Sequence, residues 1–117
     1  MIDALVIEPG GEVYDVKIND WTDYKALVGG FFECPPMNTN QLSVFCNDEG
    51  KIIGLEPNPL GTAVWHAFFD TTDMIHGTVV VTGGVDEAGE TQTLAKEDRD
   101  KLVAVLQNIA RALPGLL

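Results

Sequence analysis

The chain has 117 residues, of which 45% are hydrophobic and 21% charged, a composition typical of one globular domain with a single core. Its formal net charge of -11 argues against direct binding to nucleic acid or to an anionic membrane, because those surfaces attract clustered Lys and Arg. Residues 1–95 hold 15 acidic residues against three lysines, so the acidity belongs to this part of the chain.

The first segment, residues 2–8, is an apolar-rich stretch that predicts a strand, and residues 12–18 alternate apolar and polar side chains as a second strand does. Pro9, Gly10 and Gly11 between them indicate a turn, so the two strands form an opening hairpin. Asp20 follows as an N-cap, because its carboxylate can accept from the free amides of a first helical turn. We expect that helix to end at about residue 28, before two glycines.

The stretch from residue 41 to residue 55 predicts a second hairpin, around which we expect the fold to be organised. Leu42, Val44 and Cys46 recur at the period of a half-buried strand, and residues 47–50 are turn formers. The glycine at position 50 can adopt the left-handed conformation that closes such a turn.

Asn58 followed by Pro59 has the pattern of an N-cap and a first helical residue, which predicts a helix from residue 59 to about residue 68. The β-branched and aromatic residues of 63–69 leave a strand as the alternative. Residues 77–82 contain three consecutive valines and predict a central strand, followed by an acidic, glycine-rich loop to residue 89.

The period changes to helical after Thr93, which we interpret with residues 96–98 as a helix cap and an acidic first turn. The apolar residues of this helix fall on one predicted buried face: Leu102, Val105, Leu106, Ile109 and Leu113. These elements predict a single α+β domain over residues 1–117. It has a mostly antiparallel sheet of about five to six strands, one or two short helices, and the long C-terminal helix packed across one face.

Phe31 and Phe32 are neighbours in a predicted strand at residues 31–34, so their side chains must point to opposite faces of the sheet. We place one set of residues toward the C-terminal helix: Phe32, Cys34, Leu42, Val44 and Cys46. Phe31 and Phe45 then face the other way, where the two short helices or a second subunit would cover them. The protein is therefore expected to be a monomer or a homodimer.

No grouping of reactive residues stands out. His66, His76, Cys34 and Cys46 lack the close spacing of structural zinc ligands, and both cysteines lie in apolar alternation, as buried thiols do. The loop at 82–89 lacks the lysine of a phosphate-binding loop, and the acidic residues show no calcium-binding ladder. We assign no catalytic residue, no metal ligand and no cofactor.

Several motifs resemble a family catalogued only as a small domain of unknown function, frequent in bacteriophage and plasmid genomes and in actinobacteria. The matching stretches are residues 4–10 (Ala-Leu-Val-Ile-Glu-Pro-Gly), 27–33, 46–51, 54–58 and 77–83. The resemblance implies an accessory protein of a mobile element that acts in a bacterial host's cytoplasm, and it brings no catalytic residues. The absence of a signal peptide and of a transmembrane stretch leads to the same expected location.

Three functions remain open. We favour a non-enzymatic protein that binds a host macromolecule, expected to be a basic protein, through an acidic and partly aromatic surface. DNA mimicry is a special case of it. The alternatives are a sequestering module for a small metabolite or nucleotide signal, and an uncharacterised hydrolase. The candidate interaction surface consists of Phe31, Phe45, Asp86, Glu87 and Glu90.

Overall fold

The computed structural model describes residues 1–33, 42–68 and 73–112. The elements in chain order are β1 (Ile2–Ile7), β2 (Val13–Ile18), α1 (Trp21–Val28), β3 (Phe32–Glu33), β4 (Leu42–Asn47), α2 (Pro59–Phe68), β5 (Val79–Gly83) and α3 (Lys96–Ala112). The strands form one antiparallel sheet in the order β2-β1-β5-β4-β3, with β5 at its centre. The predicted α+β class, the long C-terminal helix and the central position of the valine-rich strand are confirmed.

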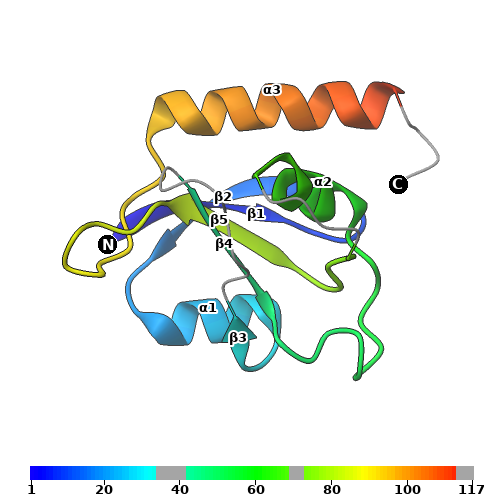
Figure 1. The fold of residues 1–117 in the computed structure, drawn as a ribbon, viewed down its shortest axis with the longest axis horizontal. Coiled ribbons are helices and arrows are strands. Elements are labelled where there is room, and N and C mark those ends of the chain that lie inside the picture. The colour runs from blue at the N-terminus through cyan, green and yellow to red at the C-terminus, as the bar shows by residue number, and fades with distance from the viewer. Residues whose placement is uncertain (34–41, 69–72, 113–117) are drawn as a thin grey trace.

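Helices cover both faces of the sheet (Figure 1). On one face, α2 and α3 bury Leu5 and Ile7 of β1 and Val79 and Val81 of β5 with the even-numbered residues of β4. On the other face, α1 covers a smaller cluster that includes Tyr24, Phe45 and Val80. No helix among the described residues is both long and apolar enough to cross a membrane.

The two N-terminal predictions are confirmed by local geometry. β1 and β2 pair along their whole lengths, from Ile2 opposite Ile18 to Ile7 opposite Val13. Asp20 caps α1 by accepting from the amide of Thr22 at 2.9 Å, and Asp23 returns a bond to the cap backbone. Gly29 ends the helix with φ at 81°, a conformation that glycine adopts without steric cost.

The predicted hairpin over residues 41–55 is wrong in its second half. Residues 42–47 form β4, but the chain from 48 to 54 is a series of turns, and the backbone amide of Leu55 donates to the carbonyl of Gly50 at 2.9 Å. β4 pairs instead with β5, which lies more than thirty residues further along, and with β3. Gly50 is also not among the glycines with positive φ, whereas Gly54 is, at 78°.

The prediction for the faces of the sheet is correct for β4 and wrong for Phe32. Leu42, Val44 and Cys46 pack toward α2 and α3 as expected. In the β3–β4 register Phe32 lies opposite Asn47, which places its ring beside Phe45, 5.9 Å between centroids. α2 also lies with α3 rather than with α1, so α1 alone among the described helices covers Phe45. Cys34 lies outside the described residues.

Asn58 joins three parts of the chain through a fully buried side chain. Its Oδ1 accepts from the amide of Gly61 at 2.9 Å, which confirms the predicted N-cap of α2. Its Nδ2 donates to the carbonyls of Ile7 at 2.8 Å and Gly77 at 2.9 Å. The side chain therefore ties the end of β1 and the entry to β5 to the start of α2.

α3 presents a narrower buried face than its sequence predicts. Leu102 and Leu106 are buried and Ile109 packs partly against the core, but Val105 is 51% exposed, and Leu113 lies outside the described residues. The expectation that Thr93 caps the helix is wrong, because its Oγ1 accepts from the amide of Asp3 at 2.8 Å. Thr93 and Leu94, in the segment before α3, therefore hydrogen-bond to β1 at Asp3.

We predict that Leu106→Ala destabilises the protein by about 2–5 kcal/mol, because it leaves a cavity where a 2%-exposed side chain packs against the sheet. Val105→Ala, one position away, should change stability by less than about 0.5 kcal/mol, as exposed substitutions usually do. Urea unfolding of both variants measures the difference. Equal midpoints for the two variants would show that α3 does not form part of the core.

Asn58→Asp should cost roughly 3–5 kcal/mol, because a carboxylate keeps the bond to Gly61 but points an uncompensated buried charge at two carbonyl oxygens. The same change at the exposed Asn108 serves as control and should stay within about 0.5 kcal/mol. The measurement is again urea unfolding. Similar stabilities for the two variants would refute the linking role of Asn58.

Candidate functional site

A cleft of about 380 Å³ lies between the β3–β4 edge of the sheet and α2. It is lined by residues of β3, the end of β4, the loop after β4, α2 and the segment before β5: Glu33, Cys46, Asn47, Asp48, Glu49, Gly50, Lys51, Ile52, Trp65, Asp73, Met74, Ile75 and His76. Glu33 lies opposite Cys46 in the β3–β4 register, so both side chains point to the α2 side of the sheet.

The loop after β4 forms one wall of the cleft and is held by the Asn47 side chain and by its own backbone. Asn47 accepts from the amide of Glu49 at 2.8 Å through its Oδ1 and donates to the carbonyl of Val28 at 3.2 Å through its Nδ2. The amide of Ile53 donates to the carbonyl of Glu49 at 3.0 Å. These local bonds satisfy backbone groups that a second hairpin strand would have used, which explains why no strand forms here.

The loop is pressed against His76. A Cβ atom added to Gly50 would lie 2.6 Å from the His76 carbonyl oxygen, closer than non-bonded atoms approach. His76 Nδ1 lies 2.9 Å from the carbonyl oxygen of Leu55. Because a carbonyl only accepts, Nδ1 carries the proton, and Nε2 is the remaining polar atom of the ring. Position 50 therefore needs glycine for close approach, not for a left-handed backbone.

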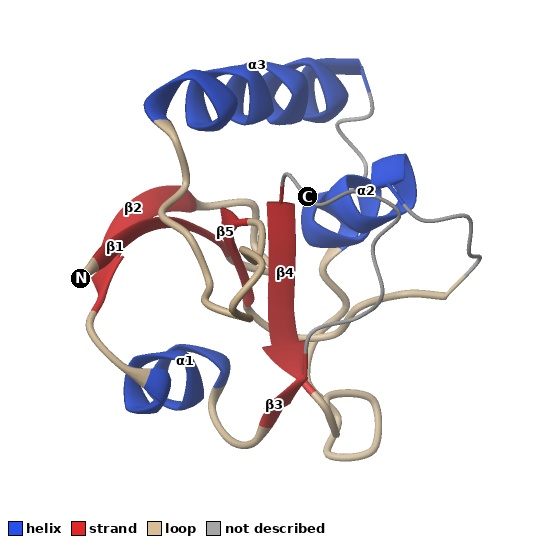
Figure 2. Cartoon of the chain, turned by 60° about the vertical axis from the view of Figure 1, so that its left-hand side comes forward, coloured by secondary structure: helices blue, strands red, loops and turns tan. Residues whose placement is uncertain are grey.

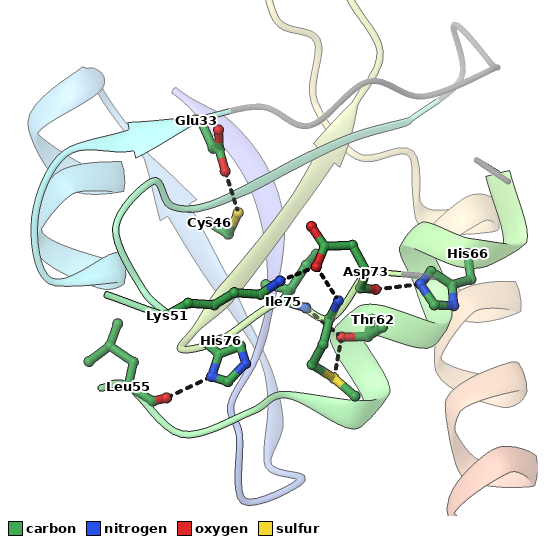
Figure 3. Close-up of polar contacts among 10 residues, drawn as sticks. Glu33, Cys46, Lys51, Leu55, Thr62, His66, Asp73, Ile75 and His76 are labelled. Carbon is green, nitrogen blue, oxygen red and sulfur yellow. Dashed lines mark hydrogen bonds and ion pairs between the residues drawn. The ribbon is translucent and has the colours of Figure 1, made fainter. Parts of the chain in front are cut away.

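Asp73 organises the opposite wall (Figure 3). Its carboxylate forms an ion pair with Lys51 and accepts from the amide of Met74 at 3.0 Å. The hydrogen bond from Lys51 holds the pKa of the Asp73 carboxyl below its usual range. His66 of α2 donates from Nε2 to the Asp73 carbonyl at 2.6 Å, so the two histidines have separate structural partners.

Buried Thr62 supports this wall from α2. Its Oγ1 accepts from the amide of Ile75 at 2.9 Å and lies 3.1 Å from the sulfur of Met74. The contact fixes the segment 73–76 against α2, so the cleft is bounded by backbone that is bonded on both sides.

The lining combines an acidic rim with an apolar base. Four carboxylates, those of Glu33, Asp48, Glu49 and Asp73, stand against one lysine. Cys46, Trp65 and Ile75 are buried beneath them, while Ile52 and Met74 are exposed at the margin. A ligand that fits these walls needs positive charge next to hydrocarbon.

The cleft brings Cys46 and His76 into one lining. The buried thiol of Cys46 donates a weak hydrogen bond to Glu33 Oε1 at 4.0 Å. Among the residues that the structure describes, no group of three or more His, Cys, Asp or Glu side chains is arranged to hold a metal ion.

The residues of the predicted interaction surface are dispersed. Phe31 is 70% exposed, with the ammonium group of Lys25 4.7 Å from its ring centroid, but Phe45 is only 8% exposed beneath Tyr24. Glu87 and Glu90 are exposed on the turn between β5 and α3. The ribbon of this turn lies on the opposite side of the molecule from the loop that follows β4 (Figure 1).

Asp86 has a structural role in that turn, because its carboxylate accepts from the amides of Ala88 and Glu90, each at 2.9 Å, and from Gln92 at 3.0 Å. It is therefore less available to a ligand than Glu87 and Glu90.

Comparison with protein families gives one match, to a domain of unknown function, DUF3846, over residues 2–107. The chain belongs to the DUF3846 family. Comparison with curated proteins and with solved structures finds no match. The match spans every strand and most of α3, so the cleft and both of its walls lie within the DUF3846 domain.

Sequence reasoning missed this cleft although it named several of its residues. Cys46 lies in β4 and His76 in the segment before β5, and neither their spacing nor their periodicity indicates that they meet. The one local signal was the run of residues 47–50, which we interpreted as a hairpin turn. In the structure that run forms one wall of the cleft.

We predict that Gly50→Ala and Gly50→Asn destabilise the domain equally, by about 1–3 kcal/mol, because both introduce the Cβ atom that meets the His76 carbonyl. Gly54 is the contrasting position, with φ at 78° and nothing within 4 Å of an added Cβ. There Asn should be milder than Ala, since Asn tolerates the left-handed region. Thermal melts of the four variants test this; a milder Asn at position 50 would contradict it.

Proposed function

We propose that this protein acts by binding, without chemistry, and that the cleft receives a basic segment of a protein partner. The observation that carries the proposal is the pairing of four rim carboxylates with an apolar base. Lys and Arg side chains have the matching form, a charged head on a hydrocarbon stem. The head would meet Glu33, Asp48 or Glu49, and the stem would lie against Ile52, Trp65 and Ile75.

The charge of the whole chain supports the same class of partner. A formal charge of -11 attracts a basic protein over distances up to the Debye length and orients it before contact. Lys51, the basic residue of the lining, is already paired with Asp73, so it offsets one carboxylate and leaves the other three for the partner.

We further propose, from the motifs shared with mobile-element proteins, that this is an accessory protein working in the cytoplasm of a bacterial host. The partner would then be a host protein. The observations that support binding do not depend on this setting, since they rest on the cleft alone.

A small cationic molecule is the second candidate. It is supported by the volume of the cleft, about 380 Å³, which falls within the roughly 300–1,000 Å³ of small-molecule sites. A nucleotide is less compatible, because the rim carboxylates would repel its phosphates. Native mass spectrometry of the purified protein separates the candidates, since a retained small molecule adds its own mass.

The test is calorimetric titration of the protein with a short Lys/Arg-rich peptide at low and high salt. Glu33→Gln combined with Glu49→Gln should weaken binding about 2- to 30-fold, since each exposed ion pair contributes about 0.2–1 kcal/mol. Glu87→Gln combined with Glu90→Gln makes the same change in charge away from the cleft and should leave affinity nearly unchanged. Raising the salt should weaken binding of the wild type more than that of the cleft variant.

The two double variants also decide between surfaces. Equal weakening by both would show diffuse attraction and reject the cleft as the site. Weakening by the Glu87 and Glu90 pair alone would assign binding to the acidic turn, as the sequence led us to expect. No binding of the peptide to wild-type protein at low salt would reject the basic partner.

A further inference from the structure

Among the residues that the structure describes, one edge of the sheet is a full strand with no further strand paired to it. β2 is the outermost strand on the side opposite β3 and the cleft, and it pairs with β1 over all six of its residues (Figure 2). β3, at the other edge, has two residues. An open edge of regular strand presents a row of amides and carbonyls to which another strand can bind.

Two observations show which backbone amides and carbonyls of β2 point toward the open edge and which bond to β1. The amide of Glu8 donates to the carbonyl of Glu12 at 2.9 Å, so alternate pairs from there on, including Val6 with Tyr14 and Ala4 with Val16, are the hydrogen-bonded ones. The bonds of Asp3 give the same alternation, because its amide and carbonyl bond to Thr93 and Leu94 and so point away from β2.

The backbone groups that β2 turns outward therefore belong to Val13, Asp15 and Lys17. The amides of Tyr14, Val16 and Ile18 are used by β1.

We propose that β2 pairs antiparallel with β2 of a second copy of this chain, with the two-fold axis at Val16. This register places Asp15, whose backbone groups point toward the edge, opposite Lys17 of the second copy. The two-fold axis generates a second such pair, Lys17 opposite Asp15 of the second copy. Val16 then lies opposite itself, and Tyr14 lies opposite Ile18 of the second copy, on the other face of the sheet. Tyr14 is 42% exposed in the single chain.

Charge selects this register over its neighbours. An axis at Asp15 or at Lys17 sets like charges directly opposite each other, which destabilises a sheet. An axis between two residues sets an outward-facing residue opposite one whose backbone groups are used by β1. Charged side chains on an edge strand usually oppose pairing, and here they do so in the two registers with axes at Asp15 and at Lys17.

The existing ion pairs extend the pattern. Lys17 is bonded to Asp3 of β1, and Arg99 of α3 binds Asp15 through two hydrogen bonds, at 2.9 and 2.8 Å. In the dimer these residues form a row of alternating charge across the junction: Asp3, Lys17, then Asp15 and Arg99 of the second copy. A groove of about 550 Å³ lined partly by Asp15, Lys17 and Arg99 gives these side chains space on the α3 side.

The inference goes beyond the proposed function, because the paired edge lies across the sheet from the cleft. A dimer formed this way leaves both clefts open, and two linked sites raise the avidity for a partner that carries two matching segments.

The experiment is native mass spectrometry of two charge variants, alone and mixed. Asp15→Lys gives a strand with positive side chains at positions 15 and 17, and Lys17→Asp gives a strand with negative side chains at both positions. Each variant alone should be monomeric where the wild type is dimeric. An equal mixture should restore a dimer containing one chain of each, recognised by its mass. Thermal melts confirm that both variants are folded.

A wild type that stays monomeric up to its solubility limit would overturn the proposal, as would variants that dimerise as the wild type does. Hydrogen exchange on the wild type gives an answer independent of the variants. The amides of Asp15 and Lys17 should slow as concentration rises, while that of Val16 stays protected throughout because it bonds to β1. Unchanged exchange at both residues across a dimer transition would place the interface elsewhere.

Discussion

The buried amide of Asn58 is the interaction on which the rest of the fold depends. Its bonds join the end of β1, the entry to β5 and the first turn of α2, three segments far apart in sequence. A buried polar group is costly without partners, so this arrangement is favoured only when all three segments are in place. It fixes α2 on the same face as α3, and it thereby sets Trp65 beneath the cleft.

The two proposed interaction surfaces differ in physical character because they lie at opposite edges of the sheet. At the β3 edge the described strand has two residues and the loop after β4 lies beside it, so the surface is a cleft with side chains from several segments. At the β2 edge the strand is regular, so the surface is the backbone itself, with specificity supplied by two charges. One sheet thus offers a site for a side chain and a site for a strand.

The elements that were predicted correctly are those whose signals are local. Asp20 and Asn58 at helix starts act within a few residues, and the β1–β2 hairpin joins neighbours in sequence. The prediction of the central hairpin was wrong because β4 pairs with β5, and the turn residues after β4 form backbone hydrogen bonds among themselves. The predicted face of Phe32 was wrong for a related reason. That face is set by the β3–β4 register, which alternation within one strand does not determine.

The candidate site shows the same division. The sequence alone determined the acidic character of the chain, the N-caps of α1 and α2 and the burial of Cys46, because charge, capping and alternation act at short range. Only the tertiary structure decided that Glu33, Lys51, Asp73 and His76 line one cleft, and that Phe45 is buried while Phe31 is not. Those outcomes depend on which strands pair and which face each helix covers, and the competing arrangements differ in contacts between residues distant in the chain.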